Sequence, residues 1–207
     1  MARKAKRAAR RRRSTPSADP KARLVAAALK LAAERSWARV TLADIARAAR
    51  LPLAEAIGLL PSKTAILAEF QRGIDRTVLA GGDGGEGGAR DRLFELLMRR
   101  FDALGPHRAA LRSIARAAPL DPAALLCGWL QLLHSMRLTL AVAGCPADGL
   151  AGLVAIKGLA GLYLSVLPVF LADRSGDHAA TMAALDKRLR CIQSLADWVR
   201  GRVPKTA

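Results

Sequence analysis

The spacing of apolar side chains constrains the fold of this 207-residue chain more than any other feature of its sequence. Apolar residues recur at steps of three and four, which is typical of helices that bury one face, and the alternation expected of a half-buried strand is missing. Between residues 21 and 34, for example, Leu24, Ala28 and Leu31 fall on one face. The sequence therefore predicts an all-α fold of about nine helices.

Capping residues and turn-forming residues indicate where the helices begin and end. Thr41 stands three residues before Asp44, so its hydroxyl can accept a bond from a first-turn amide and start a short helix near residue 41. Ser62 can cap a longer helix in the same way. The expected helices cover residues 21–34, 41–49, 53–60, 63–79, 90–104, 108–118, 122–143, 150–172 and 179–202.

Positive charge is concentrated near the N-terminus. The chain has 34 basic and 17 acidic residues. Residues 1–76 hold eighteen of the basic and six of the acidic residues, and residues 1–13 hold eight basic residues and no acidic one. Such a run suits a polyanion, because neutralised phosphates release counterions, but it reads no base sequence unless it fits a groove. Anionic lipid would satisfy it equally well, and a solvated, disordered tail is the plain alternative.

Residues that would carry enzymatic or metal chemistry are scattered. The histidines at 107, 134 and 178 lie on different expected elements, and the cysteines at 127, 145 and 191 follow no paired spacing. The six glycines of GGDGGEGG at 81–88 lack the Lys-Ser/Thr ending of a phosphate-binding loop. We therefore expect no enzyme, no metal, no cofactor and a cytoplasmic location.

The stretch from Arg23 to Phe70 resembles the TetR family of transcriptional regulators. It carries AALKLAAER, then VTLADIARAARL and then SKTAIL in register and without a gap. The resemblance implies a helix-turn-helix whose third helix enters the major groove of DNA, with phosphates held by the start of the second helix and by the fourth helix. Thr41 and Lys63 occupy those phosphate-binding positions.

The third helix departs from the family pattern. Where members commonly have Gly-Val-Ser-x-Gly-Thr-Leu-Tyr-x-His-Phe, this chain has RLPLAEAIGLL at 50–60. Ile57 and Leu59 replace the Tyr and His that usually touch the DNA backbone, and only Arg50 and Glu55 offer hydrogen-bonding groups to bases. The predicted DNA-contacting set is Arg10, Arg11, Arg12, Arg13, Thr41, Arg50, Leu53, Glu55 and Lys63.

The second half of the chain resembles bacterial relatives of the TetR-fold, lipid-binding accessory protein of ubiquinone biosynthesis. The resemblance rests mainly on RDRLFELLMRRFD at 90–102 and TMAALD at 181–186. It implies a cavity for an apolar small molecule or lipid, with a tightly packed core as the bland alternative. The predicted lining is Phe94, Met98, Phe101, Trp129, His134, Met136, Tyr163, Leu167 and Phe170.

The segment 150–172 is long enough to cross a bilayer and has one charged residue, Lys157. Lys157, Pro168 and the amphipathic neighbours favour a helix buried in a bundle or a subunit interface, so we expect no integral membrane span. By position, the last two helices correspond to the TetR dimer interface, which implies a C2 homodimer. Its expected apolar contacts are Leu150, Val154, Leu162, Val166 and Val169.

These features predict four regions: a basic disordered arm at 1–20, a helix-turn-helix domain at 21–80, a glycine-rich linker at 81–89, and a ligand-binding and dimerisation domain at 90–202. The leading hypothesis is a TetR-type repressor that binds a palindromic operator in double-stranded DNA and senses an apolar ligand. The alternative is a lipid-binding accessory protein of ubiquinone biosynthesis with a degenerate helix-turn-helix. A third is a nonspecific DNA or membrane-surface binder driven by the basic arm.

Overall fold

The computed structural model describes residues 19–85 and 87–202, with side chains up to Cys191. Within these ranges it contains helices and no strand, which confirms the predicted all-α fold, and the long helices begin and end within about one residue of the expected limits. The sequence did not indicate three short 3₁₀ turns, Trp37–Arg39, Gly105–His107 and Ala118–Leu120. The α-helices are α2 (Pro20–Glu34), α3 (Leu42–Ala48), α4 (Leu53–Leu59), α5 (Lys63–Ala80), α6 (Ala89–Leu104), α7 (Arg108–Ala117), α8 (Pro122–Val142), α9 (Gly149–Ala172) and α10 (Ala179–Arg202).

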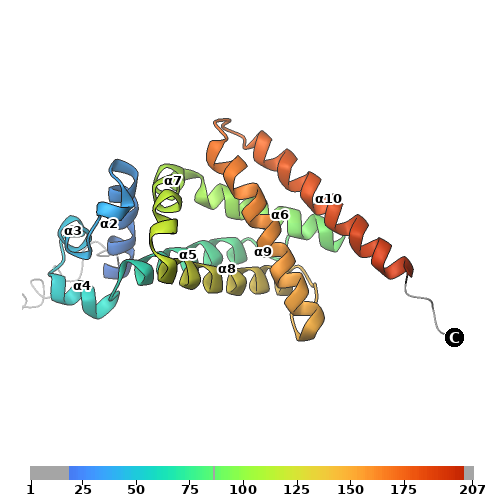
Figure 1. The fold of residues 1–207 in the computed structure, drawn as a ribbon, viewed down its shortest axis with the longest axis horizontal. Helices are drawn as coiled ribbons and strands as arrows, with labels where there is room; N and C mark the ends of the chain where they lie inside the picture. The colour runs from blue at the N-terminus through green and yellow to red at the C-terminus, as the bar shows by residue number, and fades with distance from the viewer. Residues whose placement is uncertain (1–18, 86, 203–207) are drawn as a thin grey trace, which may run out of the picture.

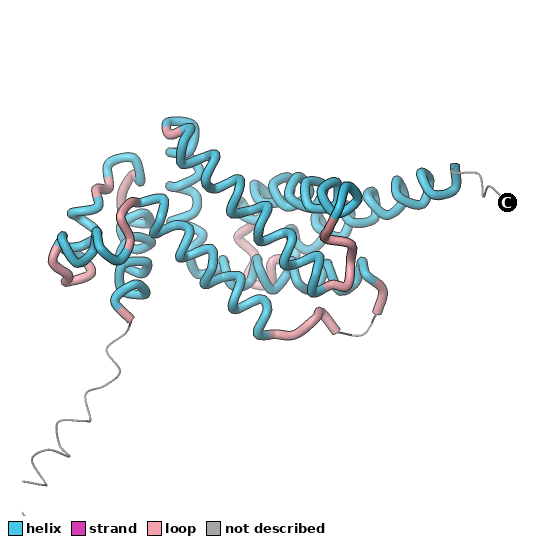
Figure 2. The backbone as a smooth tube through the Cα atoms, turned by 90° about the horizontal axis from the view of Figure 1, so that it is seen from below, coloured by secondary structure: helices cyan, strands magenta, loops and turns pink. Residues whose placement is uncertain are grey.

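The molecule is elongated, with a small head at one end (Figure 1). The head comprises α2, α3 and α4, and the body comprises α6 to α10. Helix α5 joins them, because it packs against α2 in the head and against α6 and α8 in the body. Helix α10 runs along the body and ends at the side remote from the head, as both views show (Figure 2).

The glycine-rich stretch connects α5 to α6. Arg99 of α6 donates hydrogen bonds to the carbonyl oxygens of Gly81 (2.5 Å) and Gly82 (3.2 Å), and Arg92 donates to that of Gly87 (2.6 Å). The connection is therefore tied to α6 at both of its ends. The division of the chain at residues 80 and 90 stays a prediction, and the structure adds that α5 packs with both parts.

A buried polar cluster joins three helices of the body. Arg100 of α6 forms an ion pair with Asp75 of α5, and Ser135 of α8 donates to the second oxygen of that carboxylate at 2.8 Å. Asp75, Arg100 and Ser135 are all buried. Removing one partner would leave an uncompensated charge in a dry site, which typically costs about 3–5 kcal/mol. This cluster fixes α5 against α6 and α8.

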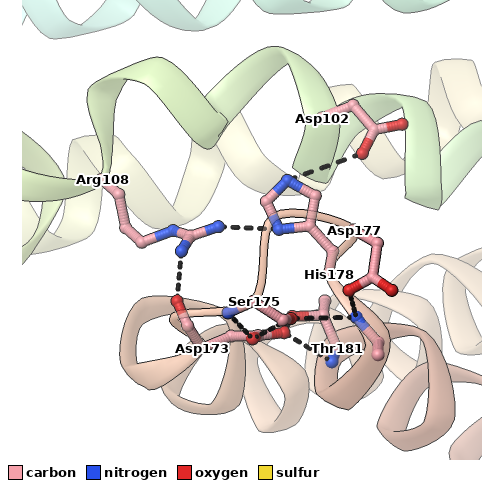
Figure 3. A network of polar contacts seen from close by, with 8 residues as sticks. Asp102, Arg108, Asp173, Ser175, Asp177, His178 and Thr181 are labelled. Carbon is pink, nitrogen blue, oxygen red and sulfur yellow. Dashed lines mark hydrogen bonds and ion pairs between the residues drawn. The ribbon is translucent and has the colours of Figure 1, made fainter.

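A second polar network fixes the connection between α9 and α10 (Figure 3). Asp173 ends α9, and its carboxylate accepts bonds from the backbone N–H of Ser175 and of Thr181, both at 3.0 Å, and from the hydroxyls of both. Arg108, at the start of α7, donates to the carbonyl oxygen of Asp173 and contacts Nδ1 of His178 at 2.7 Å. The network therefore ties the α9–α10 hairpin to α7.

Helices α8 and α9 are each long and apolar enough to cross a bilayer by length and composition, a test that core helices of soluble proteins also pass. Helix α9 buries one face against the body. Leu162 and Val166 lie on that face with 5% and 0% of their surface exposed, so the expectation that they need a partner subunit is wrong. Leu150 and Val154 lie outward and are 85% and 71% exposed.

We predict that Asp173 makes folding stability depend on acid pH. Hydrogen bonds from Ser175 and then Thr181 hold the pKa of Asp173 well below its ordinary value of 3.8. Because the folded-state pKa is lowered, this contribution is complete well above pH 4 and is lost as pH falls below that value. Asp173→Asn should lower the free energy of unfolding at pH 7 and reduce its further fall between about pH 5 and pH 3.

Urea unfolding at a series of pH values measures this effect. Asp148→Asn is the matched control, because the Asp148 side chain is 83% exposed and pairs only with Arg137 at the surface. If both variants kept the wild-type pH dependence, the carboxylate of Asp173 would not hold the hairpin.

Candidate nucleic-acid interface and ligand cavity

Helix α4 is presented outward at the end of the head. Ala56 and Leu60 bury one side of it, whereas Leu53 and Ile57 are 44% and 46% exposed. Arg23 of α2 fixes the turn before α4, since its guanidinium donates to the carbonyl oxygens of Ala49 and, at 2.9 Å, of Arg50. Helix α4, the second helix of the helix-turn-helix, therefore presents an exposed face in the described part of the chain.

Arg50 occupies the turn between α3 and α4 in an unusual backbone conformation. Its φ is +55°, in the left-handed region where residues with a Cβ are uncommon. Arg50 and Glu55 are both exposed, as is Leu53, so these three predicted contact residues lie at the solvent-facing end of the head. Their contact with DNA stays a prediction.

The predicted cap at Thr41 is confirmed. Its hydroxyl accepts from the N–H of Asp44 at 3.1 Å and donates to the Asp44 carboxylate at 2.8 Å, and its own N–H donates to the same oxygen at 3.0 Å. These bonds lower the pKa of Asp44, so an anionic carboxylate occupies the start of α3. Arg35 and Arg47 lie 3.3 and 3.4 Å from it. A phosphate bound at Thr41 would have to approach beside this carboxylate.

Lys63 has partners other than the predicted phosphate. Its ammonium donates to the carbonyl oxygens of Trp37 and Val40, each at 2.9 Å, and lies 4.7 Å from the centre of the Trp37 ring. Partial burial lowers the pKa of Lys63. Two of the three donors of the ammonium therefore hold the head against the start of α5. The predicted contacts Arg10, Arg11, Arg12 and Arg13 lie outside the described residues.

A mostly apolar cavity lies where α5, α7, α8 and α9 meet. It has two adjacent lobes of about 450 and 400 Å³, which share walls that include Leu67, Ile114, Gly128 and Leu164. The first lobe reaches the head, because Trp37 and Lys63 line it together with Trp129. The second extends into the body and is lined further by Phe70, Gln71, Leu111, Tyr163 and Leu167.

Three of the nine residues predicted to contact ligand, Trp129, Tyr163 and Leu167, line this cavity. The other six do not. Phe101 and Phe170 are fully buried and pack with their ring centroids 5.0 Å apart, behind Tyr163, and Met136 is also fully buried. Met98 is buried in the core, Phe94 packs against the core, and His134 is exposed.

The difference between the predicted lining and the walls of this cavity has a physical reason. Helical spacing shows which residues share a face, but it does not show which neighbouring helix that face meets. The walls that sequence reasoning missed come from α5 and α7, at Leu67, Phe70, Leu111 and Ile114. Their spacing is the only sequence signal they carry, and it is shared with ordinary core residues.

Few polar groups line the second lobe. Burial raises the pKa of Tyr163, so its hydroxyl is neutral at physiological pH and can donate or accept a hydrogen bond. Gln71 lines the same lobe and donates to Ser135 at 3.4 Å. In the described ranges the histidines, cysteines and carboxylates form no group suited to a metal. The cavity can therefore accept an apolar molecule and orient it with one or two polar contacts.

The head carries a helix-turn-helix and the body holds an apolar cavity, and comparison with solved structures identifies the fold that combines them. A TetR transcriptional regulator from Nitrosomonas europaea ATCC 19718 superposes with a TM-score of 0.67 and 20% identity, over 86% of this chain and 98% of that one. A TetR transcriptional regulator from Rhodococcus sp. RHA1 superposes with a TM-score of 0.62 and 19% identity, over 84% of this chain and 94% of that one. The chain therefore has the fold of TetR regulators.

No protein-family model and no curated protein sequence matches the chain. At the identities above, the likeness to the two solved structures shows the fold and leaves function to be argued from the site. The resemblance of the second half to the accessory protein of ubiquinone biosynthesis stays a prediction.

We predict that Lys63 contributes to the folding stability of the protein. Lys63→Met should lower the free energy of unfolding by about 2 kcal/mol, because two carbonyl oxygens lose a charged donor. Denaturant unfolding measures the change. Lys30→Met is the control, since Lys30 is 75% exposed and forms only a surface ion pair with Glu34 at 3.9 Å. Unchanged stability together with a weaker salt dependence of DNA binding would instead support the phosphate role.

Proposed function

We propose that the chain is a cytoplasmic, non-enzymatic, homodimeric transcriptional regulator that binds a palindromic site in double-stranded DNA and responds to an apolar ligand. The observation that carries the proposal is the outward presentation of α4 by a head whose own residues, Trp37 and Ala38, line the cavity beside Lys63 of α5. The head that would meet DNA therefore also borders the cavity that would hold a ligand.

The shared wall supplies a route from ligand to DNA. A ligand in the first lobe would touch the Trp37 ring, which lies beside the ammonium that fixes the head to α5. It would act by binding one orientation of the head better than another, and its effect is limited by that difference in affinity. A lipid, isoprenoid or other mainly hydrocarbon molecule fits the lining.

The outward face of α9 supports a homodimer. Leu150 and Val154 are largely exposed, and a Cβ built at Gly158 or Gly161 meets nothing within 4 Å. The face is therefore apolar at one end and open to the close approach of another helix further along. A C2 arrangement would bury it and place two copies of α4 on one duplex.

Selection of bound fragments from random duplex DNA by the full-length protein tests the regulator. A palindromic sequence should emerge and should bind more tightly than random DNA at physiological salt. Val154→Glu should give a monomer by sedimentation and lose most of this specific affinity, because a carboxylate would be placed in the apolar interface. Leu126→Glu, which changes a 59% exposed leucine of α8, should remain dimeric.

The alternative is a lipid-binding accessory protein that reads no operator. It is favoured by the shortage of hydrogen-bonding side chains on α4, where base reading would normally require them. It predicts co-purified isoprenoid lipid and no sequence preference in the selection. A nonspecific binder would instead lose nearly all DNA affinity when residues 1–13 are deleted.

The cavity gives a separate prediction. Gly128 lines both lobes, and a Cβ there meets nothing within 4 Å, so Gly128→Leu should fill the shared space without disturbing α8. Fluorescence titration with pyrene should show saturable binding that this variant weakens at least about tenfold. Gly58→Leu, on α4, is the matched control and should bind pyrene normally. Equal binding by both variants would place the apolar site elsewhere.

A further inference from the structure

The outward face of α4 is apolar. Leu53, Ala54, Ile57 and Gly58 follow the i, i+1, i+4, i+5 spacing that puts residues on one side of a helix, and all four are exposed. None of their side chains can donate or accept a hydrogen bond. Glu55, in the first turn, offers only acceptors.

Exposed cations lie on the neighbouring segments of the head. Arg47 of α3 is 80% exposed, and Arg39 and Arg50, which precede α3 and α4, are exposed as well. An apolar helix face beside arginines is complementary to a surface on which apolar groups lie between negatively charged groups. The major groove of duplex DNA is such a surface, because the 5-methyl groups of thymine project into it between two rows of phosphates.

We propose that α4 recognises thymine methyl groups, and that Leu53 and Ile57 determine this specificity. The inference rests on the proposed DNA-binding function and names the class of sequence that the head would read. Base discrimination then comes from apolar contact instead of hydrogen-bonded base edges, with Arg50 and Glu55 at the margin of the apolar face.

Helix geometry gives the spacing of the target. Leu53 and Ile57 are four residues apart, a rise of about 6 Å along the helix axis. Successive bases in one strand are about 3.4 Å apart, so the two side chains match thymines roughly two base steps apart. Gly58 has no Cβ, and the space beside it is empty, so the helix can approach the groove closely at that point.

Replacement of thymine by deoxyuridine in the selected duplex tests the proposal, because it removes the methyl group and leaves base pairing unchanged. At the contacted positions each replacement should weaken binding of the full-length protein about fourfold, and replacement in both half-sites about fifteenfold. Replacement outside the half-sites should have no effect. Where cytosine replaces a contacted thymine, 5-methylcytosine should bind more tightly than cytosine, because the two bases differ only in the 5-methyl group.

Protein variants assign the contacts. Leu53→Ala should abolish the thymine preference at one position and Ile57→Ala at the other, and each variant should stay folded because both side chains are exposed. Leu126→Ala, at an exposed leucine of the body, should keep both preferences.

Two outcomes overturn the inference and can be told apart. If a specific duplex is selected but deoxyuridine binds as well as thymine at every position, the head reads DNA by other contacts and the proposed regulator stands. If no duplex is selected, the inference and the DNA-binding function fail together. In the second case, a change in oligomeric state on Leu53→Ala would assign the apolar face to a protein contact.

Discussion

The arrangement of the molecule depends on the way α5 is held at both ends. At its start, the ammonium of Lys63 bonds two carbonyl oxygens of the head and lies over the Trp37 ring. Three turns further along, Asp75 is paired with Arg100 in the dry interior of the body. A helix is stiff over such a length, so the head cannot reorient without moving α5 or breaking the bonds of Lys63. Helix α2 of the head also packs along α7, and the Trp37 N–H donates to the Ser113 hydroxyl at 2.9 Å, so the placement of α4 follows from the contacts of α5 and from this second contact.

The cavity lies beside this connection, because Lys63 and Trp37 line its first lobe. Its walls come from α5, α7, α8 and α9, and α8 packs directly against α5. Phe101, Tyr163 and Phe170 form a packed aromatic cluster behind the cavity, and Tyr163 of this cluster lines the second lobe. The side facing the head is lined by Trp37 and Lys63. A ligand would therefore act mainly on the wall that the head provides.

The sequence predicted the helices well and the sites only in part. Helix limits depend on local chemistry, such as the Thr41 and Ser62 caps and the breaks at Pro52 and Gly144, and this can be read along the chain. The cavity depends on which faces meet, so Phe94, Met98 and Phe101 could not be distinguished from Leu67 or Ile114 as wall residues by spacing. The inward turn of Lys63 and the Asp75–Arg100 pair arise between segments more than twenty residues apart, for which one sequence holds no local signal.

The left-handed backbone at Arg50 has a consequence for the stability of the head. A residue with a Cβ in this conformation costs about 1 kcal/mol, a cost that glycine would avoid. Glycine at this position would relax the turn but would remove a cation from the exposed end of the helix-turn-helix. The chain thus carries backbone strain at an exposed arginine in the turn before α4, and the margin of this small domain for other destabilising changes is correspondingly reduced.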